Sequence, residues 1–220
     1  MSPAQEHSNS SSNKGASSPP RNVGEPNPTI ARELLSLRKL IRNARWRELK
    51  KQADKLLTMQ MNDQQQAETE ALREIADLAT YYRTGIAKSV DSLDSGNDFE
   101  VRKNRRVLVV EKVRDFITIL YDRKRTTYTF DEMPFSLAHK LATFEIPKSR
   151  RQVAAKAVYQ FISPLSDKQS RDEALTWLSE IEDDFGEENP KRIADSLRRI
   201  FSSDAGTPEN LVLAYQRSYC

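Results

Sequence analysis

Residues 99–144 read FEVRKNRRVLVVEKVRDFITILYDRKRTTYTFDEMPFSLAHKLATF, and this stretch decides the fold. In its middle, apolar side chains recur at every second position, as in a β-strand with one face toward a core. Ile117, Ile119 and Tyr121 share one such face. Short polar turns separate successive runs, and short turns join antiparallel strands because parallel strands need a long crossover. The stretch therefore predicts a four-stranded antiparallel β-meander that helices must cover.

Two details refine the predicted sheet. Phe99-Glu100-Val101 forms a short first strand before the polar turn at residues 102–104. Residues 107–110 are apolar on both faces, which is typical of a central strand covered on both sides.

Helical periodicity precedes the meander. A helix with Thr29 as N-cap is expected to end at Asn43, and a second helix follows at once. This pair resembles a single tetratricopeptide unit, but an ordinary αα-hairpin inside a larger core is preferred, because a stable array needs about three units. A long helix then runs from Asn62 to about Leu93, and Gly85 within it indicates a bend or a close packing contact.

Four further helices are predicted after the meander. The first begins near Pro134 and the second covers residues 150–162. The third begins at a capping box of Ser170 and Glu173 and is expected to bury Trp177. The last begins at Asn189-Pro190, a favourable N-cap and first helical residue.

These patterns predict an α+β fold. Residues 1–28 are rich in Ser, Asn and Pro and nearly lack apolar side chains, so they should be disordered and dispensable for folding. The predicted parts are a disordered N-terminal arm (1–28), a helical part with the tetratricopeptide-like hairpin and the long helix (29–93), the antiparallel β-meander (94–134), a helical subdomain (135–201) and a C-terminal tail (202–220).

Composition narrows the class of protein. The net charge of +3 is too small to argue for nucleic-acid binding by itself. The only cysteine, Cys220, excludes an internal disulfide framework. The sequence contains no run of 18 or more apolar residues, so no transmembrane helix is predicted. No secretory signal is visible at the N-terminus. Cytoplasm is the default location. Because Ser/Pro tracts also follow membrane anchors, an extracytoplasmic location is the alternative if the gene starts further upstream.

One segment carries a family resemblance. The last predicted strand reads Thr126-Thr127-Tyr128-Thr129-Phe130-Asp131-Glu132, and Met133-Pro134, Leu137-Ala138 and Leu141-Ala142 follow it. This resembles an uncharacterised family of planctomycete bacterial proteins with a Tyr-Thr-Leu-Asp-Glu-Leu-Pro strand exit and a Leu/Ala-rich helix after it. The chain differs at Phe130 and Met133, where Leu is usual, and at Phe135-Ser136, where small residues or Pro are common. The resemblance covers residues 30–185 and implies an architecture, without any catalytic residue.

Catalytic and metal-binding patterns are absent from the sequence. It contains no phosphate-binding GxxxxGK[ST] loop, no GxGxxG after a strand and no HExxH. The two histidines, His7 and His139, are far apart, and His139 points away from its neighbouring leucines, as a surface histidine would. The acidic pairs at Asp131-Glu132, residues 182–184 and residues 187–188 are expected to be solvated helix ends. No catalytic residue, cofactor or metal is therefore predicted, and the protein is not expected to be an enzyme.

A cluster of cations is the strongest functional signal. Alternate turns of a meander lie at the same end of the sheet, so two basic turns should meet there. We call these residues the basic rim: Arg102, Lys103, Arg105, Arg106, Arg123, Lys124 and Arg125. Such a rim could bind phosphates, or it could simply be a solvated edge that resists aggregation.

Two functions are consistent with these observations. The preferred prediction is a non-enzymatic scaffold or protein-interaction module with an unknown protein partner. The alternative is an anion or nucleic-acid binder that makes a weak contact through the basic rim. Exposed aromatic side chains beside the gathered cations would favour the binder, whereas cations that scatter or pair with acids would favour the scaffold.

Overall fold

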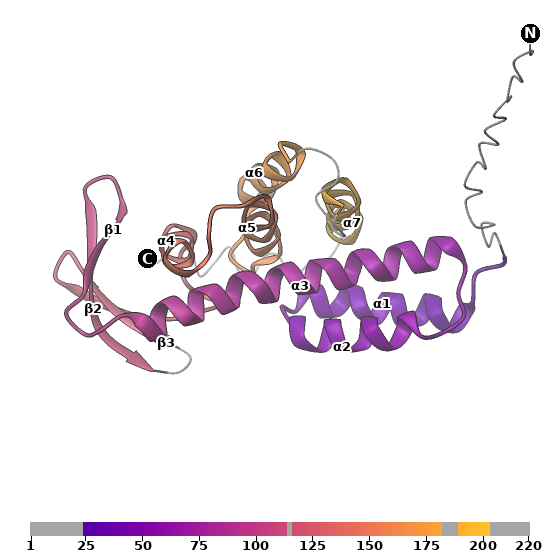
Figure 1. Ribbon diagram of the computed structural model, residues 1–220, viewed down its shortest axis with the longest axis horizontal. Coiled ribbons are helices and arrows are strands. Elements are labelled where there is room, and N and C mark those ends of the chain that lie inside the picture. Colours follow the sequence, from indigo (N-terminus) through magenta and orange to yellow (C-terminus); the bar gives the residue numbers. More distant parts are fainter. Residues whose placement is uncertain (1–23, 114–115, 182–188, 203–220) are drawn as a thin grey trace, which may run out of the picture.

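The structure is a computed structural model that describes residues 24–113, 116–181 and 189–202. Within these residues the predicted α+β fold is confirmed, with seven helices and one four-stranded antiparallel sheet. The long helix α3 (Asp63–Ser92) runs through the middle of the molecule, with a helical hairpin on one side, the later helices on the other and the sheet at one end (Figure 1).

The hairpin consists of α1 (Pro28–Arg42) and α2 (Trp46–Leu57), and both helices contact α3. Asn43 ends α1 as predicted, and Ala44 follows with a positive φ of 54°. The side chains that α2 buries are spaced three or four residues apart, as the helical period requires. They are Trp46, Leu49, Ala53 and Leu56.

The N-terminal end of α1 differs from the prediction. Asn27, not Thr29, is the N-cap, because its side-chain oxygen accepts a hydrogen bond from the Thr29 amide at 3.0 Å. The Asn27 amide also donates to Oε1 of Gln65, on the first turn of α3, at 3.1 Å. The prediction of a disordered arm through residue 28 is therefore wrong at its end, because Asn27 caps α1 and Pro28 begins it. Residues 1–23 lie outside the described residues.

Helix α3 has the predicted bounds, with Asn62 as N-cap and Leu93 as C-cap. Its glycine marks a close packing contact. A Cβ atom added to Gly85 would lie 2.4 Å from both Cγ1 and Cδ1 of Ile146, the residue that caps the C-terminal end of α4. The absence of a side chain at Gly85 lets the end of α4 approach the backbone of α3.

The sheet is an open meander in the order β1-β2-β3-β4. Its strands are β1 (Asp98–Arg102), β2 (Arg105–Val113), β3 (Phe116–Tyr121) and β4 (Lys124–Thr129). The register pairs Leu108 with Leu120 and Ile117 with Tyr128. A bulge between Val109 and Glu111 shifts the pairing of β2 with β3. A strand pair that contains such a bulge bends and twists more strongly than a regular pair.

Only one face of the sheet joins the main core. Val107, Val109, Ile117 and Ile119 are buried and define the inner face. Phe99, the partner of Val107, packs its ring edge-on against Phe144 of α4 at 5.3 Å.

The other face carries Leu108 and Leu120, which are half-buried and outside the main core, as is Val110. The prediction of a central strand covered on both sides is therefore wrong for the described residues, because helix α4 packs against a single face.

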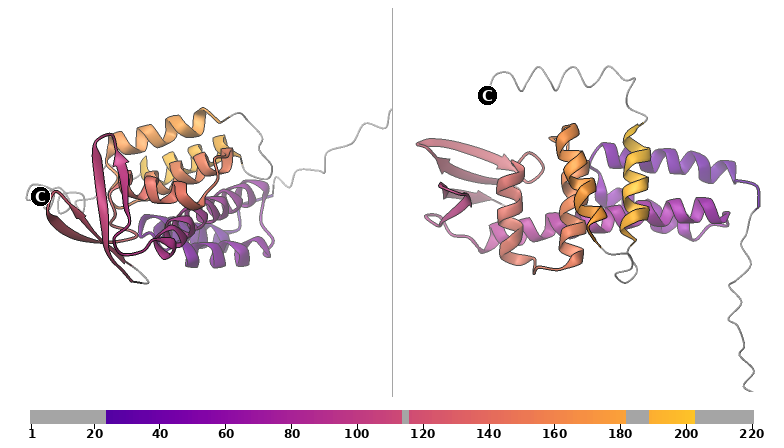
Figure 2. Two further views of the ribbon diagram at one scale, coloured as in Figure 1. Left: turned by 60° about the vertical axis from the view of Figure 1, so that its left-hand side comes forward. Right: turned by 90° about the horizontal axis from the view of Figure 1, so that it is seen from above.

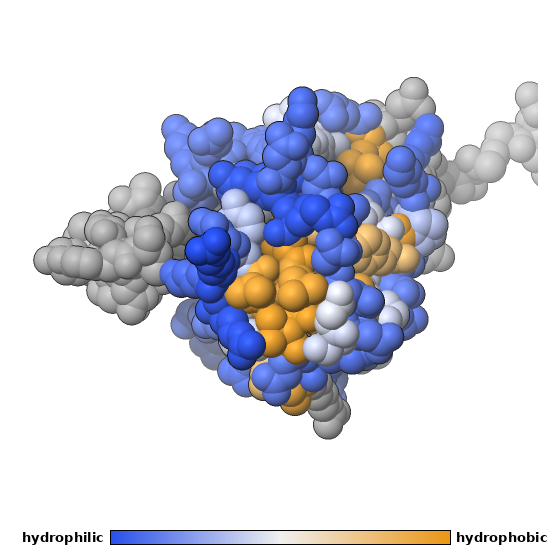
Figure 3. Space-filling view, turned by 90° about the vertical axis from the view of Figure 1, so that its left-hand side faces the viewer, coloured by the Kyte–Doolittle hydropathy of each residue, from blue (hydrophilic) through white to orange (hydrophobic). Residues whose placement is uncertain are grey.

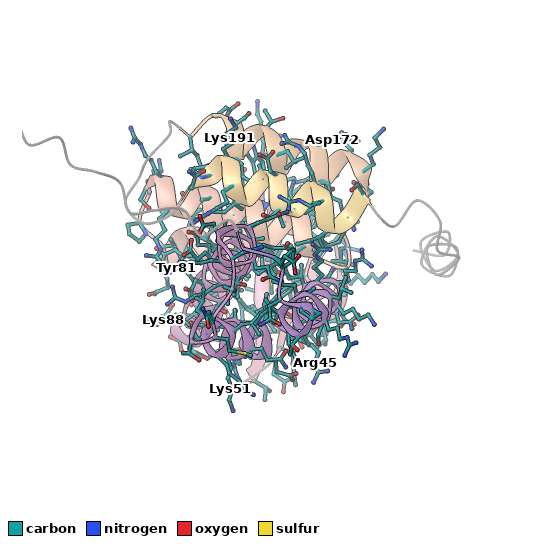
Figure 4. The ribbon with its side chains drawn as sticks, turned by 90° about the vertical axis from the view of Figure 1, so that its right-hand side faces the viewer. Arg45, Lys51, Tyr81, Lys88, Asp172 and Lys191 are labelled. Carbon is teal, nitrogen blue, oxygen red and sulfur yellow. The ribbon has the colours of Figure 1, made fainter. Side chains whose placement is uncertain are left out.

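Four helices follow the sheet: α4 (Phe135–Glu145), α5 (Arg150–Ile162), α6 (Lys168–Ser179) and α7 (Pro190–Ser202). Figure 2 shows α4, α5 and α7 succeeding one another along α3, with α6 stacked on α5. Viewed along α3 in Figure 4, the labelled Lys51 and Lys191 lie on opposite sides of the molecule.

The predicted N-terminal cap is wrong for α6 and correct for α7. Helix α6 is capped by Asp167, whose Oδ1 accepts from the Ser170 amide at 2.8 Å, so the predicted capping box of Ser170 and Glu173 is wrong. Asn189 does cap α7 as expected, since its Oδ1 accepts from the Arg192 amide at 2.9 Å.

Trp177 is half-buried, which corrects the prediction of a buried tryptophan. Its neighbour Leu178 occupies the buried face of α6, and the Trp177 ring lies at the edge of that face. The ring contacts His139 edge-on at 5.9 Å, and Nζ of Lys156 lies 3.5 Å from the ring centroid. The tryptophan therefore packs against the edge of the core and covers two polar neighbours.

Candidate binding groove on the inner face of the sheet

The meander brings its two basic turns to the same end of the sheet. The β1–β2 turn lies between Arg102 and Arg105, which are paired, and the β3–β4 turn lies between Tyr121 and Lys124, which are also paired. Both central residues of the second turn have positive φ, 48° at Asp122 and 64° at Arg123. Such a two-residue turn matches the twist of the strands and holds Lys124 directly opposite Tyr121.

All seven residues of the basic rim are exposed. Arg106 is paired with Asp98, at 2.6 Å between Nη2 and Oδ2. The other six cations have no carboxylate partner among the residues that the structure describes. Most of the rim's charge is therefore available to an anionic ligand.

Part of the rim borders a groove of about 320 Å³ that all four strands and the start of α4 line. Three rim cations line it: Arg102, Arg105 and Lys124. Aliphatic side chains form its floor, namely Val101, Val107, Ile119 and Leu137. Tyr121, which is 43% exposed, and the half-buried Tyr128 also line it, together with the hydroxyl residues Thr126 and Ser136.

The surface of the sheet end combines these two kinds of residue. Figure 3 faces this end of the molecule and shows an apolar cluster near its centre with strongly hydrophilic residues along its borders, and smaller apolar areas elsewhere. The remaining rim residues, Lys103, Arg106, Arg123 and Arg125, do not line the groove. The structure thus divides the predicted rim into a groove set and an outer set.

The first turn of α4 contributes to the electrostatics of the groove. Pro134, Ser136 and Leu137 line the groove at this point. The helix start has no side-chain cap and no acidic residue in its first turn. Unpaired amide groups at a helix N-terminus carry partial positive charge, so this end of the groove also favours an anion.

His139 is half-buried and hydrogen-bonded to two buried side chains, which corrects the prediction of a surface histidine. Its Nδ1 lies 2.8 Å from the Tyr82 hydroxyl, and its Nε2 lies 2.8 Å from Oε1 of Gln160. The Gln160 amide nitrogen in turn donates to Oε2 of Glu173 at 2.8 Å and to the Ser170 carbonyl at 3.0 Å. Since Oε1 of Gln160 must then accept, Nε2 of His139 donates and Nδ1 accepts from Tyr82.

Burial lowers the pKa of His139 to about 4, outweighing the hydrogen bond to Gln160. The imidazole is thus neutral at physiological pH, and both ring nitrogens are occupied. Burial likewise raises the pKa of Tyr82 far above its ordinary value. The network joins α3, α4, α5 and α6 and acts as a structural connection.

Other sites of chemistry are not found in the described part of the chain. Asp131 pairs with Arg83, at 2.8 Å between Oδ1 and Nε, and Glu132 accepts from the Thr129 hydroxyl at 2.9 Å. The acidic residues 182–184 and 187–188 lie outside the described residues. Across residues 24–113, 116–181 and 189–202, no cluster of His, Cys, Asp and Glu could hold a metal ion, and no helix is long and apolar enough to span a membrane.

Sequence reasoning identified the cations of the groove but missed its other walls. Tyr121 does share a strand face with Ile119, as the period-2 pattern predicts, but the sequence gives no sign that Leu137 of α4 lines the same groove. A pattern within one element does not show that the start of α4 closes the end of the sheet. The local signal was Tyr121 three residues before Lys124, across a turn of two residues.

Comparison of the chain with known protein families, with curated proteins and with solved structures finds no match. The resemblance to the planctomycete family stays a prediction.

Proposed function

We propose that this protein is a non-enzymatic interaction module that binds an acidic segment of a partner protein in the groove. One observation carries the proposal. Arg102, Arg105 and Lys124 have no carboxylate partner in the described chain, and they border an aliphatic floor. A ligand that satisfies both features carries an apolar side chain next to carboxylates. At about 320 Å³ the groove has room for one or two side chains of such a peptide.

The spacing of the aromatic residues favours a peptide over a nucleic-acid strand. Tyr128 pairs with Ile117, four residues along β3 from Tyr121, so the backbone positions that carry the two rings are about 13 Å apart along the strands. Neighbouring stacked bases lie about 3.4 Å apart, so consecutive bases cannot rest on both rings. Aliphatic side chains between the tyrosines instead match the side chain of Leu, Ile or Phe.

A selection from a random peptide library displayed on phage tests the proposal. The purified full-length protein is the bait, and we expect enrichment of peptides that place Asp or Glu beside a large apolar residue. The groove variant changes Arg102, Arg105 and Lys124 to Ser. It should bind the selected peptides at least tenfold more weakly, because the loss of even one charge-assisted contact, worth about 1.5–3 kcal/mol, lowers affinity by about tenfold or more.

The outer rim supplies a matched control. The outer-rim variant changes Lys103, Arg123 and Arg125 to Ser, so it loses the same formal charge at residues that do not line the groove. It should retain affinity within about threefold, since rim charges act mainly through long-range attraction. Equal losses in the two variants would contradict a groove site, as would selected peptides without acidic residues.

Nucleic-acid binding is the second candidate, supported by the six rim cations that lack a carboxylate partner in the described residues. Anisotropy with a mixed-sequence single-stranded DNA at increasing salt tests it. We expect no measurable binding at physiological salt. A salt-sensitive micromolar affinity that is abolished when Arg123, Lys124 and Arg125 are changed to Ser would favour nucleic acid and overturn the peptide proposal.

A further inference from the structure

We propose that a second copy of this chain supplies a ligand for the groove, through residues 182–188. This inference rests on the proposed function, because it uses the same groove. The segment reads Glu-Asp-Asp-Phe-Gly-Glu-Glu and places five acidic residues around Phe185. It has the composition that the groove requires of a ligand.

The segment matches the groove both in charge and in apolar character. The groove offers Arg102, Arg105 and Lys124, and the uncapped start of α4 adds partial positive charge. The segment offers carboxylates on both sides of one large apolar side chain. Val101 and the partly exposed rings of Tyr121 and Tyr128 provide an apolar surface for a phenylalanine ring. A ligand with acids alone would leave this floor uncovered, and one with apolar residues alone would leave the cations unpaired.

The arrangement of the helices favours binding between copies over binding within one copy. The segment joins Ile181, just beyond α6, to Asn189, the cap of α7. Phe185 is four residues from each anchor, so its Cα can lie at most about 14 Å from either one. Figures 1 and 2 show α4 and α5 between the sheet and α7. Two packed helices span about 20 Å, which favours the segment of a second copy over the segment of the same chain as the ligand.

Binding between copies would be head-to-tail. The groove of one copy accepts the segment of the next, and each copy keeps a free groove at one end and a free segment at the other. Such heterologous contacts form open chains unless the rotation between copies closes a ring. Since opposite charges drive the contact, assembly should weaken with salt.

A labelled synthetic peptide tests the contact directly. We would measure the fluorescence anisotropy of a peptide of residues 180–189 as full-length protein is added at low and at physiological salt. The groove variant should bind the peptide about tenfold more weakly, and the outer-rim variant within about threefold of the unchanged protein. A peptide with Phe185→Ala should lose about tenfold as well, because it keeps every charge but cannot cover the floor.

Sedimentation of the full-length protein tests the assembly. The average mass should rise with concentration, and Phe185→Ala should keep the chain monomeric. A monomer at all concentrations, together with a peptide that does not bind, would overturn this inference. If library-selected acidic peptides then still bind the groove, the proposed function stands and only the self-association falls. If neither kind of peptide binds, both proposals fall.

Discussion

The helical part of the molecule and its sheet end use charge in opposite ways. Between helices, cations are paired across elements: Arg38 with Glu68 at 2.5 Å, Lys50 with Asp77 at 2.5 Å, and Arg192 with Glu70 at 2.9 Å. At the sheet end, Arg106 alone among the rim cations has a carboxylate partner in the described residues. A net charge of +3 for the whole chain conceals this division.

Apolar side chains follow the same division. The middle of α3 is covered on both sides by other helices, and residues such as Ile75 and Ile86 are fully buried. The sheet meets the helices with one face and leaves Leu108 and Leu120 half-buried on the other. The helices therefore carry most of the buried apolar core, whereas the sheet end presents surface for contact.

The largest expected effect comes from the same substitution made in both regions. Leu141→Ala removes a fully buried side chain from α4 and should lower the free energy of unfolding by about 2–5 kcal/mol. Leu120→Ala, on the outer face of the sheet, should lower it by about 1 kcal/mol or less, since water already reaches part of that side chain. Chemical denaturation of both variants measures the difference. Equal losses would mean that the two regions are equally important for stability.

A smaller effect is the acid sensitivity that His139 imposes on the helical part. Its pKa is about 4 in the folded protein and near 6.5 in an unfolded chain. Between these values the unfolded chain binds the extra proton, so stability falls as pH decreases from 6.5 to 4, by an amount on the order of 3 kcal/mol. Below pH 4 both states are protonated and this contribution becomes constant.

Unfolding of His139→Gln across the same pH range isolates that contribution, because the carboxylates titrate equally in both proteins. The variant should lack the part of the slope between pH 6.5 and 4 that the original protein shows. Parallel curves for the two proteins would mean that His139 titrates normally and that the buried network is looser than described.

The next effect concerns the contact that fastens α4 to α3. Gly85→Ala should gain about 1 kcal/mol in helix propensity but destabilise the protein by about 1–3 kcal/mol overall, because the added methyl overlaps Ile146. In an Ile146→Ala background the overlap disappears and Gly85→Ala should become neutral or stabilising. A double-mutant cycle of unfolding free energies measures the coupling. Additive effects would indicate that α4 shifts freely.

The smallest effect lies at the start of the described chain. A protein that begins at Gly24 should unfold at the same temperature as the full-length protein. One that begins at Thr29 loses the Asn27 cap and the hydrogen bond to Gln65. A lost cap costs about 1 kcal/mol, which lowers the midpoint of a protein of this size by about 2–4 °C. Thermal unfolding of the two shortened proteins should separate them, and identical midpoints would show that Asn27 is dispensable.

Local rules predicted most of the fold. The bounds of α3 and α5 and the cap of α7 depend on neighbouring residues such as Asn62 and Asn189, and period-2 alternation identified the meander. These features are decided within one turn of a helix or one pair of strands. They are therefore visible in a single sequence.

The caps of α1 and α6 were wrong by two or three residues, whereas the other wrong predictions depended on contacts between distant residues. His139 points away from its neighbouring leucines, but Tyr82 lies 57 residues earlier and Gln160 lies 21 residues later, and both contact it. The Asn27 amide donates to the side chain of Gln65, 38 residues away. The groove likewise needs α4 to approach the sheet. The spacing of residue types along the sequence carries no information about these long-range contacts.

One ion pair also has a consequence for the order of folding. Arg192 on α7 binds both Glu70 and Glu74 on α3, which precede it by more than 100 residues. The meander, by contrast, pairs only strands that are neighbours along the chain. Nearby contacts form first because they close short loops, so the meander should form early and α7 should dock late. During synthesis, the two glutamates on α3 must wait for nearly the whole chain to emerge before their arginine arrives.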